Sequence, residues 1–137
     1  MGGSGGNDGF GSMQATPSFP AYLAFENSSI AIGFEFSREM GSANTHIITA
    51  HFKNKTLTGM SAVSMQVAAQ KYMSLKMKPA SGTSIGASSQ DLTQQMVIVN
   101  SAEGQKPLSL KLKINYTPDG SSPQSEIKVV NNMPTNY

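Results

Sequence analysis

The chain has 137 residues, of which ten are basic and eight acidic, and a formal net charge of +2. This length builds one domain with a core of its own and is too short for two. Only 13% of the residues are charged, which argues against a disordered chain, a long solvated helix and a coiled coil. The nearly balanced charge also argues against nucleic-acid binding, which requires a denser basic surface.

The residue types that catalysis and metal binding require are sparse. Cysteine is absent, which excludes disulfides and cysteine-based metal sites and is compatible with a reducing cytosol. His46 and His51 are five residues apart in one predicted strand, so they point to opposite faces and cannot share a metal. The acidic residues are scattered, and no serine stands in a G-x-S-x-G motif. We therefore expect no catalytic residue, no metal and no cofactor, and predict that the chain is not an enzyme.

The first residues differ from the rest in composition. The stretch MGGSGGNDGFGSM is rich in Gly and Ser and has no period, which is typical of a flexible linker, a tag or the end of a hinge. It lacks the basic and apolar regions of a signal peptide, and no run of about 18 apolar residues follows that would insert in a membrane. We predict a flexible segment at 1–16 and one folded domain at 17–137.

From Phe19 onward, apolar residues recur with a period of two, as they do in half-buried strands. The clearest run is 108–116, in which apolar residues alternate with serine, lysine and asparagine. Turn signals such as Pro118-Asp119-Gly120 separate the runs, and no helical spacing is sustained over about ten residues. The pattern predicts an all-β fold, an antiparallel sandwich or barrel of about eight strands. The expected strands are 21–26, 30–37, 45–52, 62–68, 73–78, 92–100, 108–116 and 125–130.

Three stretches carry a resemblance to a known family. Residues 65–82 contain MQVAAQK and LKMKPASG, residues 108–116 read LSLKLKINY, and residues 129–134 read VVNNMP. In this order and spacing they resemble the ear of gamma-adaptin and of the monomeric GGA adaptors. That family has a strand ending QAAVPK, a KLQPxSG turn, a basic LRxRxKLxY strand and a VNNFP tail. The resemblance covers roughly 17–137 and leaves open whether the parent is a gamma-adaptin or a GGA protein.

The resemblance implies an immunoglobulin-like β-sandwich in the cytoplasm, peripheral at clathrin coats of the trans-Golgi network and endosomes. It implies that the domain recruits accessory trafficking proteins through short extended segments. These segments carry an aromatic residue, a glycine, a variable or acidic residue and a second large apolar residue, with acidic residues nearby. An alternative is a structural immunoglobulin-like module of a secreted or surface protein, although no Cys…Trp…Cys pattern of an antibody domain is present.

Carried over residue by residue, the resemblance implies a peptide site with an apolar pocket and a basic rim. A small pocket residue leaves room for an aromatic ring, and a flexible methionine adapts to its shape. Lysines at alternate positions of one strand share a face. The pocket is expected from Ala68, Met77 and Ala80, and the rim from Lys71, Lys111 and Lys113.

The chain departs from the family pattern at a few of these positions. Ser109 stands where the family has Arg, and Gln70 and Ala80 stand where it has Pro. The remaining cations are lysines, which lack the bidentate fork of arginine. We therefore expect a modest, salt-sensitive affinity, on the order of micromolar to tens of micromolar.

Alternation alone offers plainer interpretations of the same residues. Lys111 and Lys113 fit the solvated face of a strand. Met77 has the parity of Leu75 and Met73, which fits a core position as well as a ligand contact. The nine methionines fit a core better than a promiscuous binding surface.

One motif in the first segment has the shape of the family's own ligand. Phe10, Gly11 and Met13, with Asp8 before them, give an aromatic residue, a glycine, a spacer and a large apolar residue. We hypothesise that this tethered motif occupies the pocket in cis or in a neighbouring molecule, which would produce self-association through the N-terminal tail. The plainer interpretation is a vector or hinge sequence.

Overall fold

The computed structural model describes residues 19–103, 105–134 and 137. The segment predicted to be flexible, 1–16, lies outside the described residues. The described part is built from strands alone, without a helix. In chain order the strands are β1 (Tyr22–Glu26), β2 (Ile30–Arg38), β3 (Thr45–Asn54), β4 (Met60–Ala69), β5 (Met73–Met77), β6 (Leu92–Asn100), β7 (Leu110–Pro118) and β8 (Gln124–Val130).

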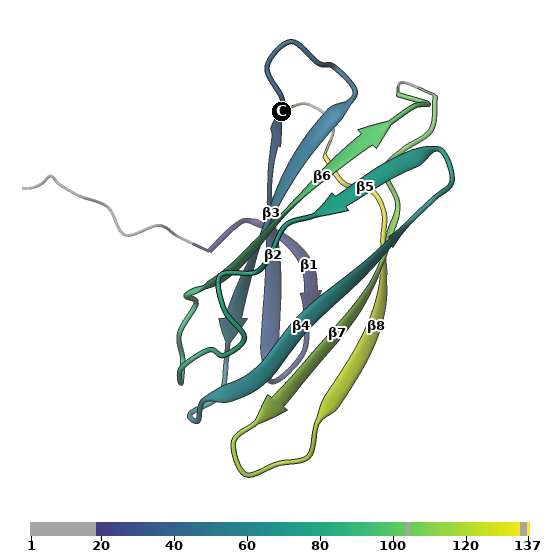
Figure 1. The fold of residues 1–137 in the computed structure, drawn as a ribbon. Coiled ribbons are helices and arrows are strands. Elements are labelled where there is room, and N and C mark those ends of the chain that lie inside the picture. Colours follow the sequence, from purple (N-terminus) through teal and green to yellow (C-terminus); the bar gives the residue numbers. More distant parts are fainter. Residues whose placement is uncertain (1–18, 104, 135–136) are drawn as a thin grey trace, which may run out of the picture.

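The strands form two antiparallel sheets that pack face to face (Figure 1). The larger sheet has the order β1-β2-β3-β6-β5, and the smaller one has the order β4-β7-β8. The chain changes sheet three times, from β3 to β4, at the short turn from β4 to β5, and from β6 to β7. The predicted all-β, immunoglobulin-like sandwich of about eight strands is confirmed, and a closed barrel is excluded.

The core lies between the two sheets, because each strand sends alternate side chains inward. Phe34 and Phe52 fill the side of the larger sheet, and Leu112 and Ile114 fill the side of β7. Several methionines complete the packing, as their number suggested. The fully enclosed or nearly enclosed methionines are Met60, Met65, Met73, Met96 and Met133.

A β-bulge interrupts β4 near its start. Ser61 pairs with Thr117, but Ser64 pairs with Asn115, so β4 carries one residue more than its partner β7 in this interval. Ala62 adopts a left-handed backbone conformation there, with φ of 52°. The bulge breaks the period of two, which explains why the expected strand at 62–68 begins earlier, at Met60.

Other strand limits follow the predictions closely. The limits of β6 are those expected, 92–100. In β7 the pairing starts at Leu110, two residues after the expected start, because the partner residues Ala69 and Val130 are the last ones of β4 and β8. No helix of the described residues is long and apolar enough to cross a membrane.

Candidate functional site

The outer face of the smaller sheet carries cross-strand rows that its register fixes. β7 lies between β4 and β8 (Figure 1), so each outward residue of β7 has a neighbour on both sides. Directly opposed side chains in antiparallel strands lie about 5 Å apart at Cβ and act together. The first row is Ala68, Lys111 and Val129, and the second row is Gln66, Lys113 and Ile127.

A shallow cavity of about 290 Å³ opens between these two rows. It brings together three residues that the resemblance implied, Ala68, Lys111 and Lys113. The bulge places Ala68 outward, and the small side chain leaves the hollow unfilled. The complete lining is Gln66, Val67, Ala68, Lys111, Leu112, Lys113 and Ile127.

The charge around the cavity has one sign. Lys111 and Lys113 are exposed on one face of β7, as alternation predicted. The outward residues of the paired stretches 64–68, 111–115 and 125–129 include no carboxylate. Both ammonium groups therefore face solvent beside an apolar hollow, an arrangement that favours an acidic ligand with an apolar anchor.

Lys71 lies in the exposed turn between β4 and β5, just beyond Ala68 along the chain. Contacts of the next residue, Tyr72, hold this turn. The hydroxyl of Tyr72 donates to the carbonyl oxygen of Pro107 at 2.6 Å, and its own carbonyl accepts from the backbone N–H and the hydroxyl of Ser101. The ammonium of Lys106 lies 5.1 Å from the centre of the Tyr72 ring. The backbone that carries Lys71 is thus anchored to the β6–β7 loop.

Met77 and Ala80 lie on the other sheet and in the segment that follows it. Both are half-buried against the core, and neither lines the cavity beside Ala68. β5 ends at Met77, before Pro79, and Met77 keeps the alternation of Met73 and Leu75, so its side chain lies on the core side of the sheet. The structure therefore gives Met77 a packing role, and its contact with a ligand stays a prediction.

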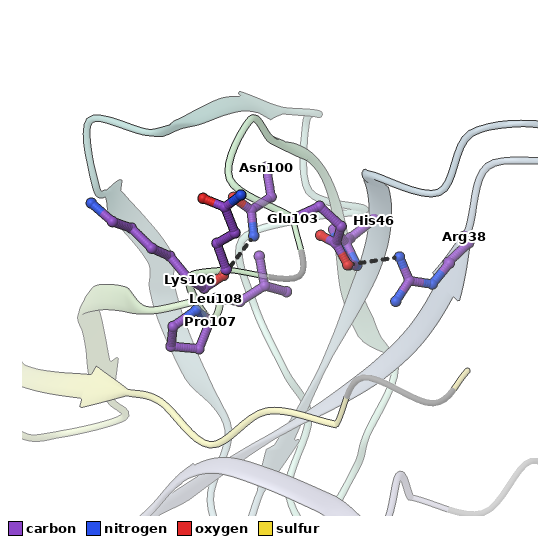
Figure 2. Close-up of a pocket in the computed structure, with 8 residues that line it drawn as sticks. Arg38, His46, Asn100, Glu103, Lys106, Pro107 and Leu108 are labelled. Atoms are coloured by element: carbon purple, nitrogen blue, oxygen red, sulfur yellow. Dashed lines mark hydrogen bonds and ion pairs between the residues drawn. The ribbon is translucent and has the colours of Figure 1, made fainter.

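A second hollow, of about 330 Å³, lies where β2, β3 and the β6–β7 loop meet (Figure 2). His46 is buried there, 1% exposed, with Nε2 2.8 Å from Oε1 of Glu103 and Nδ1 paired with the hydroxyl of Tyr137. Nη1 of Arg38 donates to Oε2 of Glu103 at 3.3 Å, and the Arg38 guanidinium lies over the Tyr137 ring. These charges neutralise one another, so the cluster joins chain segments rather than offering charge to a ligand.

The family model described as the adaptin C-terminal domain matches residues 20–134. The chain belongs to the adaptin C-terminal domain family. As expected from the three sequence stretches, it is an ear domain of the gamma-adaptin type.

Both a gamma-adaptin and a GGA protein are similar in sequence to this ear domain. The AP-1 complex subunit gamma-2 of Arabidopsis thaliana is 32% identical over 93% of the chain. The ADP-ribosylation factor-binding protein GGA2 of Saccharomyces cerevisiae is 33% identical over 92% of the chain. The chain spans 15% of the first protein and 21% of the second.

Solved structures support the same fold. The crystal structure of the GAE domain of GGA2p from Saccharomyces cerevisiae has a TM-score of 0.74 and 29% identity, and it covers 82% of this chain and 96% of that one. The yeast GGA1 GAE domain has a TM-score of 0.75 at 23% identity, with 82% of this chain and 97% of that chain covered.

Sequence reasoning missed the contribution of β8 to the cavity of the ear domain. Ile127 lines the cavity and Val129 ends its first row, yet both lie on a strand that the resemblance left without a role. The sequence signal for this contribution is that both positions are apolar, which is unusual on the outward face of an edge strand. The register of β8 against β7 is needed to place these two side chains on the outward face, and the local sequence does not determine that register.

The two histidines of the ear domain point to opposite faces, as their spacing predicted. His46 enters the interior, whereas Nε2 of His51 lies 2.9 Å from Oε1 of Glu35 on the outer face of the larger sheet. Within 19–103, 105–134 and 137, no group of three or more His, Cys, Asp or Glu side chains gathers to hold a metal. The prediction that the chain is not an enzyme stays a prediction.

The motif formed by Phe10, Gly11 and Met13 lies outside the described residues. Its role as a tethered ligand therefore stays a prediction, and it is tested with the peptide titration below.

The Glu103 cluster predicts a loss of stability in acid. Burial alone raises the pKa of Glu103, but the hydrogen bonds and charges of His46 and Arg38 outweigh burial and leave that pKa below its ordinary value of 4.5. The unfolded chain then takes up this proton more readily than the folded domain does. The contribution of Glu103 is complete above pH 4.5 and is lost as the pH falls through the lower folded-state pKa.

We expect urea unfolding between pH 3 and pH 7 to show a shallower acid decline for Glu103→Gln than for the unchanged chain. The matched control is Glu39→Gln, at an exposed position, which should leave the decline as it is. Parallel pH curves for the unchanged chain and Glu103→Gln would contradict this assignment.

Proposed function

We propose that this ear domain is an appendage of a clathrin adaptor that binds short acidic-aromatic segments of accessory proteins. We assign it to vesicle-mediated transport at the trans-Golgi network and endosomes, in the cytoplasm and peripheral at clathrin coats. The names of its relatives, an AP-1 gamma subunit and a GGA protein, support this role. The proposed ligands have the form Phe-Gly-x-hydrophobic, preceded by acidic residues.

The observation that carries the proposal is the cavity between Ala68 and the pair Lys111 and Lys113. An aromatic side chain that enters the hollow removes apolar surface from water, at about 25 cal/mol per Å². Carboxylates beside that ring are attracted to the two ammonium groups, and the outward residues of the described stretches 64–68, 111–115 and 125–129 include no competing carboxylate. Lys71, on its anchored turn, extends the basic rim past the end of β4.

The same geometry limits the affinity. The cavity is open and the lysines are solvent-exposed, so their attraction is screened within a Debye length of about 10 Å at 0.1 M salt. We expect a dissociation constant on the order of micromolar to tens of micromolar at low salt.

The test is an amide NMR titration of the 137-residue chain with a synthetic peptide that contains an acidic residue followed by Phe-Gly-Asp-Phe. We expect saturable shifts at Ala68, Lys71, Lys111 and Lys113, and weaker binding as salt rises. Shifts at Met77 and Ala80 would add the β5 side to the contact surface. No shift at millimolar peptide would rule out the proposed site.

A chain that begins at Thr16 serves as the matched comparison in this titration. If the motif at 10–13 occupies the pocket, its removal should raise the affinity for added peptide and lower any self-association. Equal affinities for the two chains would remove the tethered-ligand hypothesis and leave the peptide site intact.

A further inference from the structure

A polar hollow of about 450 Å³ opens at one end of the sandwich, where three connections meet. These are the β1–β2, β3–β4 and β7–β8 connections, which lie toward the bottom of Figure 1. The hollow shares no lining residue with the cavity beside Ala68. It is therefore a separate feature of the domain, which the proposed function does not use.

The lining of this hollow carries negative charge. Asp119 and Glu126 both line it, and neither forms an ion pair within the part of the chain that the structure describes. Among the described residues, no lysine or arginine lines it. Lys55, in the β3–β4 connection, is already 2.9 Å from Oε2 of Glu26 and donates to the carbonyl oxygen of Asn27. The hollow thus favours a cationic ligand.

The two carboxylates reach the hollow from different elements. The backbone N–H of Asp119 donates to the carbonyl oxygen of Gly59 at 2.9 Å. A Cβ at Gly59 would lie 3.0 Å from Oδ2 of Asp119, so a side chain at this position would crowd the carboxylate. Glu126 comes from β8, where it pairs with the inward residue Ile114. Lys128, the next residue of β8 on the same side, does not line the hollow.

Tyr116 adds a buried hydroxyl group to the same hollow. The residue is 3% exposed, and its hydroxyl oxygen accepts a hydrogen bond from Nδ2 of Asn27 at 3.0 Å. The hydroxyl hydrogen has no acceptor among the described residues. A hydroxyl group donates as well as accepts, and a buried donor is costly to leave unpaired. A ligand that suits the hollow therefore brings an acceptor as well as a positive charge.

We propose that this hollow binds an arginine side chain of a partner protein, together with a backbone carbonyl group beside that arginine. A guanidinium presents five N–H donors in one plane and so reaches several acceptors at once, whereas an ammonium is a compact point charge. The carboxylates of Asp119 and Glu126 are the charged acceptors, and the carbonyl group accepts from Tyr116. Hydroxyl groups from all three connections complete the lining: Ser28, Ser29, Thr56, Thr58 and Ser121.

The inference goes beyond the proposed function and does not depend on it. It gives the ear domain a second ligand, opposite in charge to the acidic segments expected beside Lys111 and Lys113. The two sites lie on different sides of β8, because Glu126 lines the polar hollow and the next residue, Ile127, lines the other cavity.

The experiment is an amide NMR titration of the 137-residue chain with two synthetic tripeptides at low salt. One is acetyl-Gly-Arg-Gly-amide. The other has citrulline in place of arginine, which keeps the shape of the side chain and removes its charge. The test variant is Asp119→Asn/Glu126→Gln. The matched control is Glu35→Gln/Glu39→Gln, which removes two exposed carboxylates from β2 and the turn after it, so both variants change the net charge equally.

We expect the arginine peptide to shift the amides of Ser29, Thr58 and Asp119, with a dissociation constant on the order of millimolar. Citrulline in the peptide, or the test variant of the protein, should each weaken this binding by about tenfold or more. The control variant should stay within about twofold of the unchanged chain, because only long-range attraction changes and salt screens it. Amide spectra check that each variant is folded.

Four results would overturn the inference. They are no shift at these amides, equal affinity for the two peptides, equal weakening by the two variants, and shifts of the same amides by calcium chloride at lower concentration than the arginine peptide requires. The last result would assign the hollow to a metal ion. The acidic Phe-Gly peptide should bind the test variant as it binds the unchanged chain. If that peptide binds neither, the proposed function fails and the arginine site stands.

Discussion

Charge reversal in the variant Lys111→Glu/Lys113→Glu is expected to weaken binding of the acidic Phe-Gly peptide by about 100-fold, or about 2.7 kcal/mol. Both lysines line the cavity, and the outward residues paired around them include no carboxylate. The variant removes two attractions and places two like charges beside the ligand, and like-charge contacts at interfaces cost several kcal/mol. Amide NMR titration at low salt measures the change.

The matched control is Lys53→Glu/Lys55→Glu, which alters the net charge equally at the end of β3, in the other sheet. It should change the affinity by about threefold or less, because only the long-range attraction between the domain and the acidic peptide changes, and salt screens that attraction. A second variant, Lys111→Arg/Lys113→Arg, conserves both positive charges. It should bind at least as well as the unchanged chain, because the guanidinium of arginine can form two hydrogen bonds with one carboxylate. Equal weakening by the two reversals would show that net charge, and not the cavity, governs binding.

Replacement of Asn54 by alanine is expected to lower the free energy of unfolding by about 3 kcal/mol. This side chain is fully buried at the end of β3. Its Nδ2 donates to the carbonyl oxygens of Thr58, Ile85 and Gly86 at 2.8, 3.2 and 3.1 Å. Its Oδ1 accepts from the backbone N–H and the hydroxyl of Thr56. Alanine removes all five of these hydrogen bonds, each of which contributes about 0.5–1.5 kcal/mol. The carbonyl oxygens of Thr58, Ile85 and Gly86 each keep a second donor, whereas the backbone N–H of Thr56 loses the acceptor that Oδ1 provides.

Urea unfolding at neutral pH measures the effect. Asn115→Ala is the matched control, since Asn115 is half-buried and its amide donates to the hydroxyl of Ser64 at 3.3 Å. That variant should lose about 0.5 kcal/mol or less. Similar losses for the two variants would contradict a special role for Asn54. Peptide affinity of folded Asn54→Ala should remain unchanged, because the residue lies outside the candidate site.

Strand positions were predictable wherever one face of a strand is buried and the other is solvated. The apolar alternation in 108–116 corresponds to β7, whose inward Leu110, Leu112 and Ile114 reach the core. Alternation was less informative in β4, because the extra residue at the bulge shifts the pattern by one. It was misleading in β8, an edge strand with inward charges and outward apolar residues.

The candidate site was predictable in part for the same physical reasons. Parity places Lys111 and Lys113 on one face, and the structure keeps them there. Their meeting with Ala68 depends on the register between β4 and β7, which arises from tertiary pairing and has no signal in the local sequence. For the same reason the sequence did not predict that Ile127 lines the cavity. Met77 lies on β5, which belongs to the other sheet.

Because of the bulge at Ala62, the candidate site depends on how many residues β4 contains as well as on which residues they are. Side chains of a strand alternate, so the single extra residue decides that Gln66 and Ala68 face outward while Met65 and Val67 face the core side. Loss of one residue there would turn over the half of β4 that carries the candidate site, although the deleted residue lies outside the cavity. In a lineage of such domains, the candidate site is therefore more vulnerable to a one-codon deletion at the start of β4 than to many substitutions among its lining residues.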